Sequence, residues 1–294
     1  MKAVVFPGQG SQNVGMASER YHAEPAVKKI IDQADEILGF SLSNIMFEGP
    51  EESLKQTEFT QPALYVHSMA VFQTSEISPD CVAGHSLGEF SALTAAGVLS
   101  FEDGLKLVRL RGQLMQDAGE LSNGGMGAII GLEDKVVAQI CDNISEESNE
   151  IVVPANYNSS GQIVISGHSN AVNLALNASK EIGAKMAIPL AVSGAFHSPL
   201  MQSAYDEFKL SLEKVTFFDA EVPVYSNVNA TPSKSADELK NNVLHQLLEP
   251  VLWTQTIEQM VSNGVKEVVE LGPGKVLQGL IKRIDRSLQL SGIQ

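Results

Sequence analysis

One serine lies between two glycines where an apolar run meets a helical pattern. Residues 84–88 read Gly-His-Ser-Leu-Gly, directly after the apolar residues 81–83 and before the helix-like residues 90–96. A strand, a sharp turn and a helix in this order are typical of a nucleophile elbow in an α/β protein. The glycines stand where a Cβ would crowd the turn. Such an elbow exposes the Ser86 hydroxyl and directs the backbone N–H of Leu87 and the helix N-terminus toward an oxyanion formed there.

Apolar runs alternate with helical patterns along much of the chain. Strands are expected near residues 3–6, 81–83, 222–228 and 265–271. Helices are expected over residues 26–38, 61–74 and 101–117, the last of them behind a capping box that begins at Ser100. This alternation predicts an α/β domain with a largely parallel sheet.

The middle of the chain has the order β-α-β-β-α-β, which is typical of a ferredoxin-like unit. Its strands are expected at 126–130, 151–155, 162–166 and 185–189, and its helices at 133–144 and, capped by Ser169, at 170–182. We therefore expect a large α/β-hydrolase-like domain with a parallel sheet, formed by residues 1–122 and 191–294. A small ferredoxin-like domain, residues 123–190, would be inserted into it through an entry linker within 119–127 and an exit within 190–194. A site is expected in the cleft between the two domains.

Charge and composition exclude several classes of protein. Acidic residues outnumber basic ones by 35 to 20, and the net charge of −15 argues against nucleic acid and against an anionic membrane surface. No apolar run approaches the length of about 18 residues that a transmembrane helix needs. Residues 1–7 are typical of a strand and a turn, not of a signal peptide. Cys81 and Cys141 are too few for a disulfide framework and lack metal-ligand spacing, so we expect core cysteines in a cytoplasmic protein without a metal.

A serine nucleophile needs a base, and among side chains only histidine has an unperturbed pKa near neutrality. His197 is expected in a loop, because Pro199 holds the residue before it extended and a helical pattern follows from residue 200. His85 is the alternative base. Neighbours in an elbow point in different directions, so we favour His197 over His85. Surface or packing positions are expected for the remaining histidines, which are His22, His67, His168 and His245.

Two arginines lie on the helix expected over residues 101–117. Arg109 and Arg111 are two positions apart and face different ways, so at most one of them points into a site. Solvated helix charges are the ordinary alternative for both. An arginine at the site would suit an acyl substrate with a carboxylate, which its planar fork binds in a bidentate manner.

Two polar loops have both a structural and a functional interpretation. Residues 8–12 lack the third glycine of a dinucleotide fingerprint, and the Gly-Lys pair at 274–275 lacks the other residues of a P-loop. The first loop is therefore either a tight turn or a means of bringing the N–H of Gln9 to an oxyanion. Residues 156–161 are either a polar turn or a ligand-binding segment.

Six short motifs occur in order along the chain. They are residues 6–12 (Phe-Pro-Gly-Gln-Gly-Ser-Gln), 84–89 (Gly-His-Ser-Leu-Gly-Glu), 110–112 (Leu-Arg-Gly), 156–158 (Asn-Tyr-Asn), 194–198 (Gly-Ala-Phe-His-Ser) and 270–275 (Glu-Leu-Gly-Pro-Gly-Lys). With these motifs, and with the lengths between them, essentially the whole chain resembles the malonyl-CoA:acyl carrier protein transacylases of bacterial fatty-acid synthesis.

The resemblance implies roles for the matching residues. Ser86 would be the nucleophile and His197 the base of a dyad, and the backbone oxygen of Gln246 would steady the histidine in place of a triad acid. The N–H groups of Gln9 and Leu87 would form the oxyanion hole. Arg111 would hold the malonyl carboxylate.

The remaining implications concern specificity and partners. Phe196 matches the pattern of malonyl-selective members, and His85 and Asn156 are further substrate-binding candidates. The partners would be malonyl-CoA and the phosphopantetheine arm of acyl carrier protein. A thiolate leaves easily, so no cofactor is expected, and we expect a monomer. An acidic carrier would need a local basic cluster, for which the candidates near the expected cleft are Lys185, Lys275, Lys282 and Arg283.

Three alternatives remain open from the residues themselves. A serine hydrolase or thioesterase on an α/β-hydrolase scaffold would use the same elbow and histidine. A stand-alone acyltransferase serving a polyketide synthase would have the same catalytic residues. A carrier-binding module without activity ranks below both, because it has no use for an exposed elbow serine and a histidine.

Overall fold

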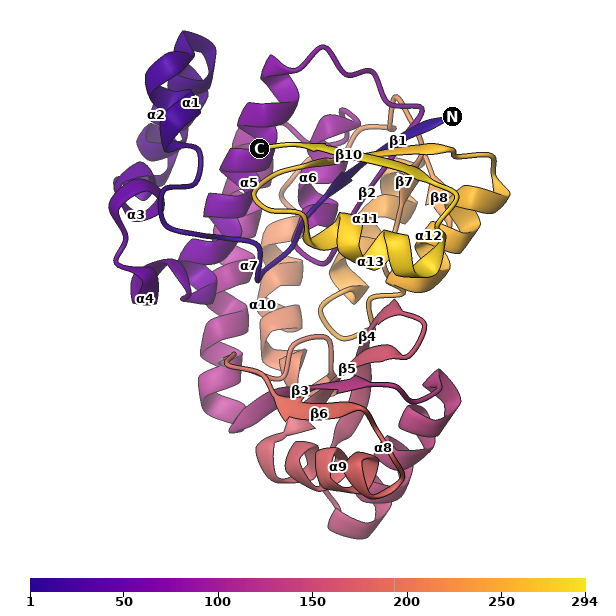
Figure 1. Cartoon of the computed structure of the whole chain (residues 1–294). Coiled ribbons are helices and arrows are strands. Elements are labelled where there is room, and N and C mark those ends of the chain that lie inside the picture. The colour runs from indigo at the N-terminus through magenta and orange to yellow at the C-terminus, as the bar shows by residue number, and fades with distance from the viewer. Residues whose placement is uncertain (193) are drawn as a thin grey trace.

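Two β-sheets organise the chain, which is described by a computed structural model over residues 1–192 and 194–294 (Figure 1). The larger sheet contains β1 (Lys2–Phe6), β2 (Cys81–Gly84), β7 (Val224–Tyr225), β8 (Pro232–Ser233), β9 (Glu267–Leu271) and β10 (Gln289–Ile293), in the order β10-β9-β1-β2-β7-β8. Every neighbouring pair from β10 to β7 is parallel, and only β8 runs antiparallel to β7. The prediction of a largely parallel sheet in a mixed α/β protein is confirmed.

Helices pack against both faces of this sheet. The helices outside residues 124–189 are α1 (Ser18–Ala23), α2 (Pro25–Leu38), α3 (Leu42–Glu48), α4 (Glu51–Leu54), α5 (Thr57–Thr74), α6 (Gly88–Ala95), α7 (Phe101–Ser122), the short 3-10 helix Pro199–Met201, α10 (Gln202–Leu212), α11 (Ala236–His245), α12 (Trp253–Ser262) and α13 (Val276–Ile284). Val4 and Phe6 of β1 pack into a core with α5, α6 and α7, whereas Ala3 and Val5 pack into a second core with α12 and α13. Burial on both faces explains why β1 is a continuous apolar run.

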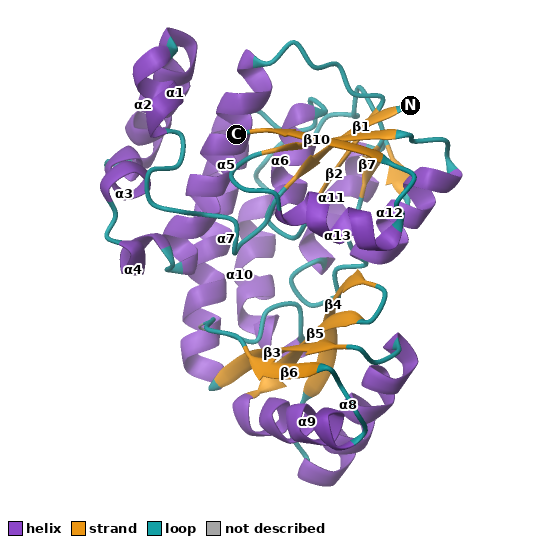
Figure 2. Cartoon of the chain, in the orientation of Figure 1, coloured by secondary structure: helices purple, strands orange, loops and turns teal. Residues whose placement is uncertain are grey.

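The second sheet is formed by one continuous stretch of chain (Figure 2). Its elements are β3 (Gly124–Ile130), α8 (Asp134–Ser148), β4 (Val152–Ser159), β5 (Gln162–His168), α9 (Ser169–Glu181) and β6 (Met186–Pro189). The strands are antiparallel in the order β4-β5-β3-β6. Both helices pack against this sheet around a separate core that includes Ile163, Ile165 and Leu176.

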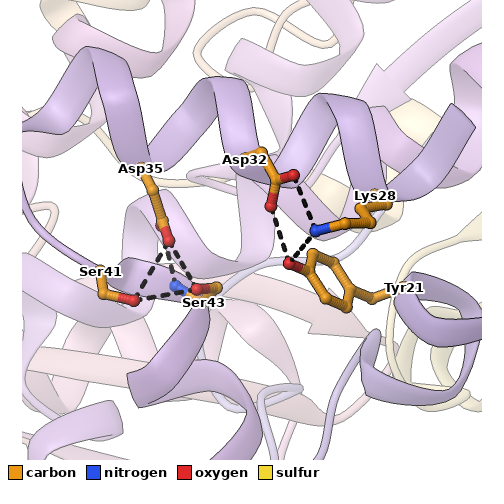
Figure 3. Close-up of polar contacts among 6 residues, drawn as sticks. All are labelled: Tyr21, Lys28, Asp32, Asp35, Ser41 and Ser43. Carbon is orange, nitrogen blue, oxygen red and sulfur yellow. Dashed lines mark hydrogen bonds and ion pairs between the residues drawn. The ribbon is translucent and has the colours of Figure 1, made fainter. Parts of the chain in front are cut away.

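The N-terminal helices are joined by polar contacts along α2 (Figure 3). The Tyr21 hydroxyl donates to Asp32 over 2.8 Å, and Lys28 forms an ion pair with the same carboxylate at 2.9 Å. One turn further on, Asp35 accepts from the backbone N–H of Ser43 at 3.0 Å. These contacts fix α1 and α3 to α2. Among the described residues, none of the helices is both long and apolar enough to cross a membrane.

Several local predictions are wrong. No linker occupies residues 119–127, because α7 continues to Ser122 and β3 begins at Gly124, leaving only Asn123 between them. Asn123 has φ 45°, a left-handed conformation that asparagine tolerates and that ends the helix abruptly. Residues 156–159 belong to β4, so the polar turn is only two residues long. The expected exit, 190–194, includes residue 193, which lies outside the described residues.

Two further corrections concern an end cap and a strand. Ser169 is the first residue of α9 instead of its cap, and its hydroxyl donates to the Asn123 carbonyl at 2.8 Å. The strand expected over residues 222–228 covers only Val224–Tyr225. The chain leaves the sheet at this point because Asn227 turns to contact the elbow after β2, through a bond from its side-chain amide to the Gly84 carbonyl.

Candidate active site

The elbow lies where the sequence places it, between the end of β2 and the start of α6. Ser86 has φ 52°, a strained conformation that costs on the order of 1–3 kcal/mol. A Cβ on Gly84 would lie 1.8 Å from the carbonyl carbon of Gly88, and a Cβ on Gly88 would lie 2.1 Å from the Phe6 oxygen. Both positions therefore require glycine.

Asn227 holds the strained turn from the neighbouring strand end. Its side-chain oxygen accepts from the Ser86 N–H at 2.7 Å, and its side-chain amide donates to the Gly84 carbonyl at 2.7 Å. Carboxyl ends of parallel strands meet at one edge of a sheet, and β2 and β7 are adjacent. Asn227 was not predicted as a site residue, because it fell inside the strand expected over residues 222–228, whereas the observed strand ends at Tyr225.

His197 lies against the serine. Its Nε2 is 2.7 Å from Ser86 Oγ, and its Nδ1 is 2.7 Å from the backbone oxygen of Gln246. A carbonyl oxygen only accepts, so Nδ1 carries the proton and Nε2 is free to accept the serine proton. Burial, reinforced by the nearby Arg111 charge, lowers the pKa of His197 to about 3. The imidazole is therefore neutral near pH 7, as a general base must be.

The shifted pKa of His197 predicts an unusual pH profile. An unperturbed histidine, with a pKa of about 6.5, would lose its basic form as the pH falls from about 8 to about 5. His197 stays neutral over this whole interval because its pKa lies below it. We expect the rate of Ser86 acylation by a neutral ester, p-nitrophenyl acetate, to change less than about twofold over that range. A fall with a midpoint of about 6.5 would show instead that His197 titrates as an exposed histidine does.

Arg111 points into the site, and Arg109 points away from it. Arg111 is 1% exposed, and its Nη2 donates to Ser86 Oγ at 3.2 Å and to the side-chain oxygen of Gln246 at 2.7 Å. Its Nη1 donates to Gln61 at 2.8 Å. Burial lowers the pKa of Arg111 to about 9, which leaves the guanidinium protonated at neutral pH. Arg109 instead forms an ion pair with Glu58 at 2.8 Å, so the divergence of the two arginines is confirmed.

The two predicted oxyanion-hole residues lie beside the elbow. Gly8 contacts the elbow so closely that a Cβ there would be 2.4 Å from the His85 oxygen, which brings Gln9 next to it. Leu87 directly follows Ser86 and precedes the first turn of α6. Neither the N–H of Gln9 nor that of Leu87 has a hydrogen-bond acceptor among the described residues. Two free donors therefore flank the serine.

The other predicted site residues differ in where they lie and in what they contact. His85 is bound by Asn158, through a 2.8 Å contact between Nε2 and the amide oxygen, and burial lowers its pKa. Asn156 instead lies in β4 opposite Val251, beyond the end of α11. Phe196 is buried next to His197. The four basic candidates for carrier docking are all exposed: Lys185 precedes β6, and Lys275, Lys282 and Arg283 lie at the two ends of α13.

Glu89 is a further site residue that the sequence analysis missed. It is 1% exposed and accepts from the side-chain amide of Gln246 at 2.6 Å and from the Asn227 N–H at 3.1 Å. Burial raises the pKa of its carboxyl to about 7. The available signal was its position as the last residue of the elbow motif, in the buried first turn of α6.

Comparisons with known proteins show the family of the chain. A family model described as the acyl transferase domain matches residues 3–290. The malonyl CoA-acyl carrier protein transacylase of Bacillus subtilis is 47% identical over 290 residues, which is 98% of this chain and 91% of that protein. The chain belongs to this acyl transferase family.

Solved structures of family members have the same fold. The malonyl CoA-acyl carrier protein transacylase from Coxiella burnetii superposes with a TM-score of 0.96 at 43% identity, covering 99% of this chain and 93% of that chain. A malonyl-transacylase solved in complex with a type II PKS acyl-carrier protein superposes with a TM-score of 0.95 at 42% identity, covering 99% and 95%. The likeness therefore extends over both sheets.

Proposed function

We propose that this protein transfers the malonyl group from malonyl-CoA to the phosphopantetheine thiol of acyl carrier protein and so supplies fatty-acid elongation. The observation that carries the proposal is a serine–histidine pair at 2.7 Å with a buried arginine 3.2 Å from the same hydroxyl. A nucleophile, a base and a carboxylate-binding cation around one oxygen suit an acyl group that carries a second carboxylate. The names of the relatives support the same substrate and acceptor.

The reaction would follow a ping-pong course. His197 Nε2 takes the proton of Ser86 as Oγ attacks the thioester carbon, and the proton then passes to the departing CoA sulfur. The carrier thiol then attacks the malonyl-serine ester, with His197 taking the thiol proton and returning it to Ser86 Oγ as the ester bond breaks and the malonyl-carrier thioester forms. The free N–H groups of Gln9 and Leu87 would stabilise the oxyanion in both halves. The Gln246 carbonyl would hold the protonated Nδ1 of the histidine in place.

Arg111 would bind the malonyl carboxylate, with Phe196, His85 and Asn156 lining the acyl and pantetheine path. Arg111→Ala removes the cation, and breaking a buried charge pair costs about 3 kcal/mol or more, which is roughly a hundredfold in kcat/KM. Acetyl transfer has no carboxylate to place and should change little. Arg111→Lys should not restore malonyl transfer, because a lysine cannot reproduce the bidentate fork.

The check is kcat/KM for malonyl-CoA and for acetyl-CoA in both proteins, with Arg109→Ala as the matched control on the same helix. An equal loss for the two substrates would make Arg111 a structural residue. If only Arg109→Ala lost kcat/KM for malonyl-CoA selectively, Arg109 instead of Arg111 would be the arginine that binds the malonyl carboxylate.

The finer description of the fold is also a proposal. The strand order β4-β5-β3-β6, with α8 and α9 packed on this sheet, supports a ferredoxin-like domain inserted into an α/β-hydrolase-like domain. The end of α7 at Ser122 and the end of β6 at Pro189 support the proposed boundaries 1–122, 123–190 and 191–294. The cytoplasmic location and the monomeric state stay predictions from the sequence.

Carrier docking is proposed at the basic residues of α13 together with Lys185. The enzyme and the carrier are both acidic, so a local positive patch must overcome their net repulsion. Lys282→Glu with Arg283→Glu should raise KM for the carrier about tenfold and leave KM for malonyl-CoA unchanged, and added salt should weaken carrier binding in the unmodified protein. Unchanged carrier kinetics in the double variant would place the docking surface elsewhere.

Incubation with malonyl-CoA, with and without phosphopantetheinylated carrier, tests the function as a whole. A transferase forms malonyl-carrier and releases little malonate, whereas a thioesterase or hydrolase releases malonate with or without the carrier. The polyketide alternative has the same catalytic residues, so it is tested by comparing rates with fatty-acid and polyketide carriers. A strong preference for the polyketide carrier would overturn the proposed pathway.

A further inference from the structure

Arg111 is a buried cation with no carboxylate in direct contact among the described residues. Its guanidinium is bound by two amide oxygens, those of Gln61 and Gln246, and by the Ser86 hydroxyl. Burying an unbalanced charge is costly, and amide oxygens offset only part of that cost. The negative charge that balances Arg111 comes from Glu89, which favours the charged form of the guanidinium without direct contact.

The side chain of Gln246 lies between the two charges and its orientation is fixed by them. A carboxylate can only accept, so Nε2 of Gln246 is the atom that donates to Glu89 at 2.6 Å. The amide oxygen then faces Arg111 at 2.7 Å. Because Glu89 is separated from Arg111 by one amide, the Nη2 atom that faces Ser86 is not occupied by a carboxylate of the protein.

We propose that Glu89 is a positioning residue for acyl selection: its buried carboxylate, held one amide away from Arg111 by Gln246, balances the guanidinium and weakens its hold on the acyl carboxylate of the substrate. This inference rests on the proposed function, since it takes Arg111 as the group that binds that carboxylate. A direct ion pair would block Arg111, and a guanidinium without any counter-charge would bind the acyl group too tightly to pass it on.

In this arrangement, binding of the substrate carboxylate is coupled to protonation of Glu89. A bound malonyl carboxylate brings a second negative charge toward Glu89, which favours the protonated form of Glu89. The pKa of the Glu89 carboxyl is already raised to about 7 by burial, so the free site holds a mixture of both forms near neutrality. Malonyl-CoA should therefore bind more weakly as the pH rises and Glu89 ionises.

Few other groups titrate near Glu89. Arg111, from α7, is the charged group that faces it. His197 stays neutral because its pKa is lowered to about 3, and burial also lowers the pKa of His85. The other polar partners of Glu89 are uncharged: Gln246 at the end of α11, and Asn227 and Ser226 after β7. A pH dependence between about 6 and about 8 in the binding of the acyl carboxylate is thus assigned to Glu89.

Binding measurements on the Ser86→Ala protein test this without any turnover. Dissociation constants for malonyl-CoA and acetyl-CoA are measured by calorimetry at pH about 6 and about 8, and their ratio removes the titration of the CoA phosphates that both ligands share. We expect malonyl-CoA to lose about tenfold in affinity relative to acetyl-CoA over this range. With Glu89→Gln added, the relative affinity for malonyl-CoA should become independent of pH and equal the low-pH value.

The matched control is Glu270→Gln in the same background. Glu270 is also a buried carboxylate, but it accepts from the N–H groups of Leu277 and Gln278 at the start of α13. Its removal should leave the pH dependence intact. A pH-independent ratio in the Ser86→Ala protein itself would overturn the inference even if the Glu89 variant failed to fold. Arg111→Ala tests the underlying proposal separately. If this variant keeps the preference for malonyl-CoA over acetyl-CoA, Arg111 does not bind the acyl carboxylate, and the proposed role of Arg111 is wrong whatever Glu89 does.

Discussion

Replacing Ser86 with alanine is expected to abolish acyl transfer and leave the fold intact. The substitution removes only the hydroxyl, while the contacts that hold the elbow come from the backbone of this residue: its N–H binds Asn227, and its carbonyl accepts from Gln246 at 3.0 Å. Without Oγ no acyl ester can form. Transfer measured with malonyl-CoA and carrier should fall by more than about 10⁴-fold, and the circular dichroism spectrum and melting temperature should stay close to the parent values.

Ser91→Ala is the matched control for this result. Ser91 lies in α6, the helix that follows the elbow, is fully buried, and its hydroxyl has no hydrogen-bond partner among the described residues. Its replacement should therefore preserve activity. Residual transfer by Ser86→Ala at more than a few per cent of the parent rate would mean that another group accepts the acyl chain.

Replacing His197 with alanine should slow acylation by about 10²–10⁴-fold, the usual contribution of a positioned general base. The histidine is the only base within reach of Ser86 Oγ among the described residues, and its other nitrogen is held by the Gln246 carbonyl. The loss should appear in pre-steady-state acylation by malonyl-CoA.

His85→Ala is the comparison that decides between the two histidines. His85 is bound by Asn158, whereas the hydrogen bonds of Ser86 Oγ in the described part of the chain go to His197 and Arg111, so the loss of His85 should cost less than about tenfold unless the elbow itself moves. Rate losses in the reverse order would transfer the role of base from His197 to His85.

Local sequence predicted the elbow well because its determinants are adjacent in the chain. The strand, the glycines and the helix all lie within residues 81–95, and the close approach of Gly84 to Gly88, and of Gly88 to Phe6, explains why neither glycine can carry a side chain. The divergence of Arg109 and Arg111 followed from helical geometry in the same way. Similarly, alternation of apolar runs and helices was enough to predict a largely parallel sheet.

What the sequence did not reveal depends on contacts between distant segments. Asn227 lies 141 residues from Ser86 in the chain, and nothing nearby in the sequence indicates that its amide would hold the turn. The charge balance around Arg111 was hidden for the same reason, because Gln246 joins it to Glu89 across three elements. The continuation of α7 to Ser122 was missed since its glycines suggested a linker, whereas packing keeps Gly119 buried within the helix.

The most direct test of a malonyl-serine intermediate is the intact mass of the protein after mixing with malonyl-CoA in the absence of carrier. We predict a single malonyl adduct per chain, located on Ser86 by peptide mapping and removed when phosphopantetheinylated carrier is added, with malonyl-carrier as the product. No adduct together with carrier-dependent transfer, or an adduct on a residue other than Ser86, would contradict the proposed mechanism.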